Sequence, residues 1–305
     1  MRAVAAPLAT VIMAALLLCA FAKSQPALAG VYARPGDSFG QTHYYVIRND
    51  ESLIEIARTF NVGYNEIVAA NPGIDPFTPP PDTAVIIPST WILPDMAEKP
   101  GIVINIPEMR LYVFQEHGTS GVLSFPVGIG GAGRATPLGR FTIIDKIVHP
   151  SWYVPRSIRR ARPKLPAIVP PGRDNPMGSH ALRLSKRTIL IHGTNRPFSI
   201  GRQATHGCIR LYPEDIARLF QLVQTGTPVT IIDQPVKITE WNGQVYVETH
   251  GSHSANLLEP ARKLLRGKGL YEKTDETLLK RALHERRGIP VNISPRRKQH
   301  GSASN

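Results

Sequence analysis

The sequence predicts a mainly β domain that is preceded by a small α+β unit and followed by a helical extension. Three observations support this prediction. Runs of β-branched and aromatic residues with strand-like lengths fill the middle of the chain. Before them, one short stretch changes from a strand pattern to two helix patterns and back to a strand. After residue 233, an Asn-Gly hairpin signal precedes a segment whose apolar residues repeat with helical spacing.

The first 29 residues predict a cleaved leader and not a part of the fold. Arg2 provides a positive charge, and the apolar run at 11–22 is too short to span a bilayer. The small-x-small sequence at 27–29 fits a cleavage site before Gly30. We therefore expect an exported protein of the periplasm, with no stable membrane span once the leader is removed. A retained N-terminal anchor is the alternative.

Cysteine usage indicates a reactive thiol. Removal of the leader removes Cys19 and leaves Cys208 without a partner for an internal disulfide. Thiols in oxidising compartments are usually paired, so an unpaired one suggests a chemical role. Its neighbours Thr205, His206 and Arg210 are polar, unlike the surroundings of a cysteine that serves as a small hydrophobic residue.

The chain carries a formal net charge of +13, which favours acidic partners such as anionic lipid or a carboxylate-rich polymer. Because we expect export, we expect no nucleic-acid partner. Much of the positive charge lies beyond residue 260, and charge runs of this kind are usually solvated faces.

Residues 43–88 predict a compact βααβ unit. Its first and last residues have strand composition, and Asp50 or Ser52 caps a helix with apolar residues at helical spacing. A second short helix ends at the Asn-Pro-Gly sequence 71–73.

This unit resembles a LysM domain, a small fold that binds glycan chains containing N-acetylglucosamine. The residues that carry the resemblance are Tyr44, Val46, Leu53, Ile56, Ala57, 60–62, Ile67, 70–72 and 85–88. The resemblance implies binding to the glycan strands of the cell wall. A spacer that has kept only the fold is the alternative.

Residues 89–100 predict a proline-containing linker, and residues 101–233 predict the β domain. The expected strands are 102–106, 109–114, 122–129, 141–148, 181–185, 188–191 and 228–233. Residues 149–178 are rich in proline, arginine and glycine and are long for a connector, which indicates a lid or cleft wall. The glycine-rich turn at 128–133 is not followed by Gly-Lys-Ser/Thr, so it does not indicate a nucleotide-binding loop.

Residues 234–293 predict an extension made of a hairpin and a helix. Asn242-Gly243 joins two short strands, a polar break follows, and Thr274 caps a helix at 275–287 that ends at Gly288. Residues 294–305 predict a disordered tail.

The segment around Cys208 gathers the groups needed for thiol chemistry. A thiol is a poor nucleophile until it is ionised, and an adjacent imidazole can hold it as a thiolate–imidazolium pair. His192 follows a predicted strand and approaches from a neighbouring strand end, whereas His206 is only two residues away in a tight turn. Backbone N–H groups of Gly207 and Cys208 offer an oxyanion hole, and Arg210 offers a partner for a substrate carboxylate.

Two other chemistries use the same residue types. His192, His206 and Cys208 are possible zinc ligands, but a fourth ligand is not evident and His-x-Cys is an unusual spacing. A papain-like protease places its cysteine before its histidine, which is the reverse of the order here.

The same segment resembles the signature of the L,D-transpeptidase catalytic domain of the YkuD type. The motif residues are His192-Gly193-Thr194-Asn195, Gly201 and Thr205-His206-Gly207-Cys208-Ile209-Arg210. Further matching stretches are 102–105, 109–112, 125–130, 136–139, 175–178 and 181–184. With a leader and a LysM-like unit in front, the chain is similar to the periplasmic ErfK/YbiS/YcfS/YnhG group.

This resemblance implies a β-sandwich with a short helix after the active-site cysteine, and it implies a mechanism. Cys208 attacks the carbonyl between the third stem residue of peptidoglycan and D-Ala, His192 takes the thiol proton, and the Gly193 carbonyl orients the ring. The groups that bind the oxyanion or the substrate are Gly207, Thr205, His206 and Arg210. No metal ion or organic cofactor is implied.

The acceptor of the resulting thioester stays open. A stem-peptide amine gives a 3→3 cross-link, a lysine of an outer-membrane protein or lipoprotein gives an anchored protein, and water gives a carboxypeptidase. A catalytically inactive peptidoglycan-binding protein is the alternative from another functional class.

Overall fold

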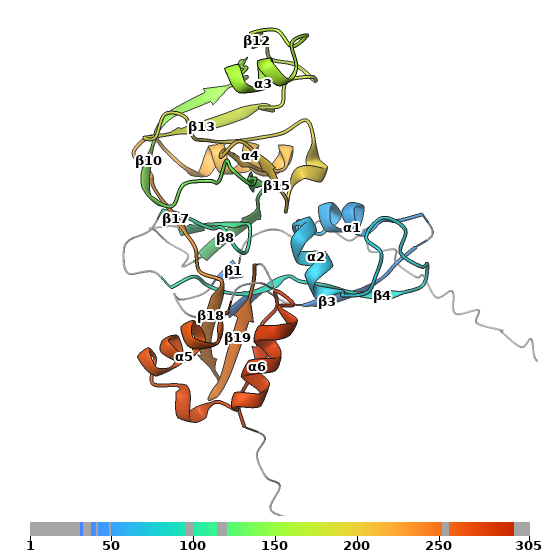
Figure 1. Cartoon of the computed structure of the whole chain (residues 1–305), viewed down its shortest axis with the longest axis vertical. Helices are drawn as coiled ribbons and strands as arrows, with labels where there is room; N and C mark the ends of the chain where they lie inside the picture. Colours follow the sequence, from blue (N-terminus) through green and yellow to red (C-terminus); the bar gives the residue numbers. More distant parts are fainter. Residues whose placement is uncertain are drawn as a thin grey trace, which may run out of the picture.

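A computed structural model of the chain describes residues 31–32, 38–40, 42–48, 50–95, 101–114, 121–251 and 256–295. The expected leader lies outside these residues, as do positions 296–305 of the expected tail. None of the helices in the described part has both the length and the apolar character needed to cross a bilayer. The described elements form three packed units (Figure 1).

The first unit has the predicted βααβ order. It consists of β3 (His43–Val46), α1 (Leu53–Thr59), α2 (Tyr64–Ala70) and β4 (Ala84–Ile87), with β3 antiparallel to β4. Of the two predicted caps, Ser52 is the one that starts α1. Its Oγ accepts the Glu55 N–H at 3.2 Å, and the Glu55 carboxylate accepts the Ser52 N–H at 3.0 Å.

The second unit is built on one curled, mixed sheet. In the described chain its nine strands follow the spatial order β1 (Val31–Tyr32), β8 (Gly121–Pro126), β7 (Arg110–Phe114), β6 (Ile102–Asn105), β17 (Pro228–Ile232), β10 (Gly139–Val148), β13 (His180–Leu184), β14 (Leu190–His192) and β16 (Ile209–Arg210). The β6–β17 and β14–β16 pairs are parallel. The sequence places the strands well but gives no information on this order.

The sheet curls at β10. Its first half pairs with β17 and its second half with β13, and the register shifts between Ile143 and Asp145. Such a bulge bends a strand, so the two halves of the sheet enclose one core. Leu111 from one half and Leu182 from the other belong to it, and both are fully buried. The implied sandwich therefore takes the form of a single sheet that folds over itself.

Shorter elements complete this unit. They are β9 (Ile129–Gly130), which pairs with β15 (Gln203–Thr205), η1 (Pro197–Ser199) and α4 (Pro213–Leu222). Pro213 occupies the first turn of α4 with Glu214 and Asp215 beside it, a pattern typical of a helix start. Ile216 and Leu219 of α4 fill the core below the sheet.

The third unit contains the predicted hairpin and two helices instead of one. Its elements are β18 (Val236–Trp241), β19 (Gln244–Thr249), α5 (Leu258–Gly267), η2 (Tyr271–Lys273), α6 (Glu276–Glu285) and β20 (Val291–Asn292). The predicted polar break is wrong at α5, because its one lysine and two arginines mask a buried stripe of Ala261 and Leu265. Asp275 caps α6 in place of Thr274, accepting the Thr277 N–H at 2.8 Å.

Part of the predicted linker is a strand. Residues Thr90–Ile92 form β5, which pairs with β2 (Ser38–Gly40). Trp91 and Ile92 are 7% and 1% exposed, because this strand runs between the three units and is covered by them. Pro88 and Pro94 flank this short strand, so its composition resembles that of a linker.

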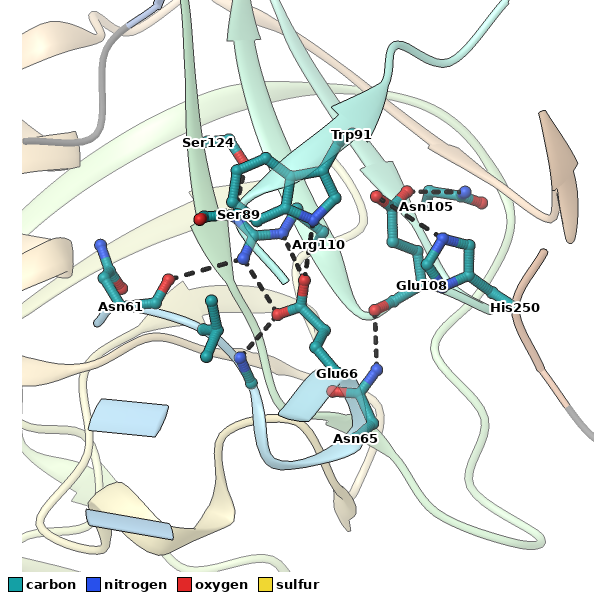
Figure 2. Close-up of polar contacts among 12 residues, drawn as sticks. Asn61, Asn65, Glu66, Ser89, Trp91, Asn105, Glu108, Arg110, Ser124 and His250 are labelled. Carbon is teal, nitrogen blue, oxygen red and sulfur yellow. Dashed lines mark hydrogen bonds and ion pairs between the residues drawn. The ribbon is translucent and has the colours of Figure 1, made fainter. Parts of the chain in front are cut away.

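A buried ion pair joins the first unit to the second (Figure 2). Glu66 of α2 accepts from Arg110 Nε and Nη2 of β7, both at 2.9 Å, and from Trp91 Nε1 at 3.0 Å. Arg110 Nη1 donates to Ser124 Oγ at 2.6 Å. With both charged side chains at most 1% exposed, the pair depends on these additional hydrogen bonds for its stability.

A second buried cluster joins the second unit to the third. Lys237 Nζ lies 2.8 Å from Glu108 and 2.7 Å from Glu248, and His250 Nε2 lies 2.6 Å from Glu248. Burial raises the pKa of Glu108, but Lys237 and His250 outweigh it and hold this pKa at about 2. Glu108, Glu248 and His250 are close enough together to bind a metal ion, yet the Lys237 ammonium already supplies the cation between the two carboxylates.

Candidate active site

Two parallel strands bring the predicted nucleophile and base to one face of the sheet. In the β14–β16 pair, Ile191 lies opposite Ile209 and His192 lies opposite Arg210. Side chains alternate along a strand, so the two buried isoleucines point into the core while His192 and Arg210 point to the other face. Cys208 directly precedes β16 and shares the face of Arg210.

These side chains line a cavity of about 690 Å³. Five of the seven predicted site residues contribute to its wall, namely His192, Thr205, His206, Cys208 and Arg210. Gly193 and Gly207 lie behind the wall, where their backbone groups bond to neighbours. The cavity is large enough for a peptide segment, which fits a substrate that extends beyond the reacting bond.

The surroundings of His192 favour the neutral form of its ring. Its ring is 4% exposed, and Nδ1 lies 2.7 Å from the Gly193 carbonyl, so Nδ1 carries the proton and Nε2 is the nitrogen that can accept one. Burial, and then the charge of Arg210, lower the pKa of His192 to about 4. The ring can therefore act as a base at neutral pH.

The Cys208 thiol is half-buried and donates to the Thr188 carbonyl at 3.7 Å. Burial raises the pKa of the thiol, against the opposing effects of the Leu190 backbone and Arg210. Desolvation disfavours the charged form of both groups, so burial opposes the expected thiolate–imidazolium pair. Among the described residues the thiol bonds to Thr188 and the imidazole to Gly193, and the two groups do not bond to each other.

The turn before Cys208 is fixed by its own hydrogen bonds. Thr205 Oγ1 donates to the Cys208 carbonyl at 2.6 Å and accepts the Gly207 N–H at 3.2 Å. Gly207 has a φ of +99°, a conformation that favours glycine. The Gly207 N–H expected in the oxyanion hole is thus engaged inside the turn, and the Thr205 hydroxyl is engaged there as well.

The cavity is rich in positive charge. Arg210 is half-buried, and its Nε is buried without a hydrogen-bond partner among the described residues. Burial, and then the charge of Arg196, lower the pKa of Arg210. Arg134, Arg162 and Arg196 also line the cavity, with Asp174 as the single acid among the described lining residues. An unpaired guanidinium in such a place suits a carboxylate ligand.

His206 is exposed at the rim of the cavity. Partial burial, and then the charges of Arg134 and Arg210, lower the pKa of its ring. It lies in the same turn as Cys208, but its side chain belongs to the arginine-lined side of the cavity.

The lid, residues 149–178, contributes to the wall of the cavity. The sequence shows no periodicity there, but β11 (Trp152–Tyr153) pairs with β12 (Ile168–Val169), and α3 (Arg156–Ala161) lies between them. These elements have six residues or fewer, which is too short to leave a repeating pattern.

Asn175 holds the two ends of the lid together. Its Nδ2 donates to the carbonyls of Pro150 at 2.8 Å and Pro170 at 3.1 Å, while its Oδ1 accepts the Met177 N–H at 2.8 Å. The side chain is 1% exposed. Because proline lacks a backbone N–H, a proline-rich segment can form few backbone hydrogen bonds. The buried Asn175 side chain supplies hydrogen bonds in their place.

The end of the lid rests on the base of the active site. Gly178 has a φ of +69°, and a Cβ there would lie 2.9 Å from Gly193 Cα. The Met177 carbonyl lies beside Gly193 and partly opposes the lowering of the His192 pKa. Met177, Arg134 and Arg196 carried no chemical signal in the sequence, because each reaches the site from a loop that only folding brings there.

Comparison with known proteins gives the family. Residues 99–231 match the L,D-transpeptidase catalytic domain, YkuD, and residues 45–88 match the LysM domain. The chain is 39% identical to the probable L,D-transpeptidase YcfS of Escherichia coli K12 over 83% of this chain and 84% of YcfS. It is 39% identical to the probable L,D-transpeptidase ErfK/SrfK of the same organism over 91% and 96%, and 38% identical to the probable L,D-transpeptidase YbiS over 81% and 84%. The protein therefore belongs to the L,D-transpeptidase family and carries a LysM domain in front of its catalytic domain.

Proposed function

We propose that this protein is a peptidoglycan L,D-transpeptidase with Cys208 as its nucleophile and His192 as its base. The observation that carries the proposal is their common placement: the end of β14 and the residue just before β16 present both side chains in one arginine-lined cavity. The family membership supports the reaction type, and the cavity supports a substrate with carboxylates.

The first half of the reaction follows from the two neutral groups. Nε2 of His192 accepts the thiol proton as Sγ of Cys208 attacks the carbonyl carbon between the third stem residue and D-Ala. The C–N bond breaks, the imidazolium gives its proton to the leaving amine, and D-Ala departs. The product is a thioester on Cys208. Nδ1 keeps its proton throughout, because its N–H donates a hydrogen bond to the Gly193 carbonyl at 2.7 Å.

Stabilisation of the oxyanion is assigned to the Cys208 N–H. The Gly207 N–H points to Thr205 Oγ1 at 3.2 Å and is occupied there. The Thr205 hydroxyl fixes the Cys208 carbonyl on the other side of the same residue, at 2.6 Å. A rigid turn of this kind keeps a backbone donor aimed at one position, which is how such donors lower a barrier.

In the second half of the reaction an amine attacks the thioester and restores the thiol. The acceptor is a stem-peptide amine, which gives a 3→3 cross-link, or a lysine of an outer-membrane protein or lipoprotein. Arg196 and Arg210 are assigned to carboxylates of the stem peptides, because both line the cavity and Arg210 Nε has no hydrogen-bond partner among the described residues. We further propose that the LysM domain binds the glycan strand and that the protein acts in the periplasm after loss of its leader.

Product analysis tests this proposal. The mature chain is incubated with disaccharide tetrapeptides, alone and with a lysine-terminated peptide, and the products are separated and weighed by mass spectrometry. We expect D-Ala release with a 3→3 dimer or a peptide adduct from the wild type, and neither from Cys208→Ala. Tripeptide without any cross-linked product would identify water as the acceptor, and undiminished release by Cys208→Ala would refute the assignment.

A further inference from the structure

The short connection between α1 and α2 of the LysM domain, residues 61–64, contacts the catalytic domain on both sides of Cys208. We call this connection the LysM turn. It touches residues 200–202 upstream of the thiol and residues 212–215 downstream of it. These two segments frame the part of the chain that carries the nucleophile.

The upstream contact is a close backbone approach with a stacked side chain. The Tyr64 N–H donates to the Ile200 carbonyl at 3.3 Å. A Cβ on Gly201 would lie 2.2 Å from the Tyr64 nitrogen, so only glycine fits there. The Arg202 guanidinium lies over the Tyr64 ring, 3.8 Å from its centroid.

The downstream contact is made of two hydrogen bonds from side chains. The Tyr212 hydroxyl donates to the Val62 carbonyl at 3.2 Å, and Asn61 Nδ2 donates to Asp215 Oδ1 at 3.2 Å. Asn61 has a φ of +52°, and its own carbonyl faces Arg110 Nη2 at 3.5 Å, as Figure 2 shows. The Glu66–Arg110 pair therefore contacts the LysM turn through the Asn61 carbonyl.

The downstream segment bonds to the backbone of His192, and the upstream segment leads into the strand that precedes the Cys208 turn. The Leu211 N–H donates to the His192 carbonyl at 2.9 Å, one residue before Tyr212. The Arg202 carbonyl accepts the Ile129 N–H at 3.1 Å, just before the strand that ends at Thr205. Movement of either segment changes the position of the Cys208 turn relative to His192.

We propose that the LysM turn is a positioning element of the active site, with Tyr64 as its principal positioning residue. The inference rests on the proposed roles of Cys208 and His192. It assigns to the LysM domain a second task that is independent of glycan binding, namely to hold both ends of the segment that presents the thiol. Misplacement of a reacting group by about 1 Å lowers a rate by up to about 100-fold, so the effect is large enough to measure.

The experiment uses the full mature chain and a stem tetrapeptide without sugar, so that glycan binding does not contribute. Tyr64→Leu removes the ring beneath Arg202, and Tyr64→Phe keeps it. Tyr44→Leu is the matched control, because Tyr44 belongs to the same domain, is 77% exposed and lies outside the LysM turn. For each variant kcat, KM, the rate of acylation by a carbapenem and the thermal unfolding midpoint are measured.

We expect kcat and the acylation rate of Tyr64→Leu to fall about tenfold or more, with KM unchanged, and Tyr64→Phe and Tyr44→Leu to match the wild type. Wild-type rates for Tyr64→Leu, or an equal loss in Tyr44→Leu or Tyr64→Phe, overturn the proposal. If Tyr64→Leu is unfolded at the assay temperature, Arg202→Gln is measured instead, because it removes the guanidinium that stacks on the Tyr64 ring. The same loss of kcat and acylation rate is then expected, and wild-type rates overturn the proposal.

The two readouts separate this proposal from the proposed function. Carbapenem acylation depends on the thiol and the imidazole but not on the natural substrate. A wild-type chain that is acylated by the carbapenem and leaves tetrapeptides intact would contradict the proposed function. The positioning role would then still be decided by the acylation rates of the Tyr64 variants.

Discussion

The side-chain amide of Asn61, in the LysM domain, donates a hydrogen bond to Oδ1 of Asp215, in the catalytic domain, at 3.2 Å. Asp215 is 5% exposed, and its Oδ2 is buried without a hydrogen-bond partner among the described residues. Burial, and then the neighbouring Glu214, raise the pKa of Asp215 to about 7. The contact between the two domains thus contains a carboxyl group that titrates near neutral pH.

Stability is expected to fall as the pH rises through this pKa. Between its ordinary pKa of 3.8 and the raised value of about 7, the folded chain holds a proton on Asp215 that the unfolded chain releases. The contribution is fully present below pH 3.8 and is lost above about pH 7. We predict that Asp215→Asn raises the thermal midpoint at pH 8 relative to the wild type and changes it much less at pH 5.

The control for this prediction is Asp82→Asn, which changes an exposed acid in a backbone conformation that asparagine tolerates. Its midpoint is expected to follow the wild type at both pH values. A difference between Asp215→Asn and the wild type that is the same at pH 5 and pH 8 would contradict the raised pKa.

The pH dependence of acylation tests the neutral imidazole. His192 accepts the thiol proton only when its own ring is neutral, and its pKa is lowered to about 4. We predict that kcat/KM with a stem tetrapeptide loses activity on the acid side near pH 4 and not near pH 6.5, the ordinary value for histidine. His192→Gln should abolish the reaction across the whole range. An acid limb near pH 6.5 in the wild type would mean that the ring is less desolvated than its 4% exposure implies.

Substrate charge tests the arginines of the cavity. Arg196 and Arg210 both line the cavity. The buried Nε of Arg210 has no hydrogen-bond partner among the described residues. We predict that Arg210→Gln raises KM for a stem peptide with free carboxylates and leaves KM for the amidated peptide nearly unchanged. The loss of a charge-assisted pair corresponds to about 1.5–3 kcal/mol, or roughly 10- to 100-fold in kcat/KM.

Arg202→Gln serves as the matched control for charge, since its guanidinium stacks on Tyr64 outside the cavity wall. It should not change the ratio between free and amidated substrates. Equal effects of Arg210→Gln on the two peptides would show that the guanidinium contributes nothing to recognition of a carboxylate.

The Glu66–Arg110 pair is expected to stabilise the docked LysM domain. Arg110→Met would leave the Glu66 carboxylate buried without its cation, which costs about 3–5 kcal/mol. The double variant Glu66→Gln/Arg110→Met removes the unpaired charge and should recover part of this loss, as a double-mutant cycle in urea would show. If Arg110→Met and the double variant are equally unstable, the destabilisation comes from lost packing against Trp91 and not from the charge.

The sequence predicts the elements with local signals and misses those without them. Ser52 with Glu55 and Pro213 with Glu214 mark helix starts that the structure contains. Helix α5 was missed, because its buried face consists of few residues among many cations. The lid elements are too short for a periodic pattern, and β5 resembles a linker because prolines surround it.

At the site, the sequence identifies the residue types but not their state. The motif places Cys208 and His192 in one segment, and the pairing of β14 with β16 brings them to one cavity. Neither the motif nor the composition shows how deeply a side chain is buried. The raised pKa of the thiol and the lowered pKa of the imidazole both result mainly from burial, so the sequence could not predict them. The contacts of residues 61–64 connect parts of the chain about 150 residues apart and likewise depend on tertiary structure.

The central claim is that Cys208 carries the acyl group, and intact-protein mass spectrometry during turnover tests it most directly. The wild-type chain is mixed with a stem tetrapeptide, quenched in acid within the first turnovers, weighed and mapped by proteolysis. The account predicts one tripeptide acyl group per chain, attached to Cys208, with one equivalent of D-Ala released. An acyl group on any other residue, or D-Ala release without a covalent intermediate, would contradict it.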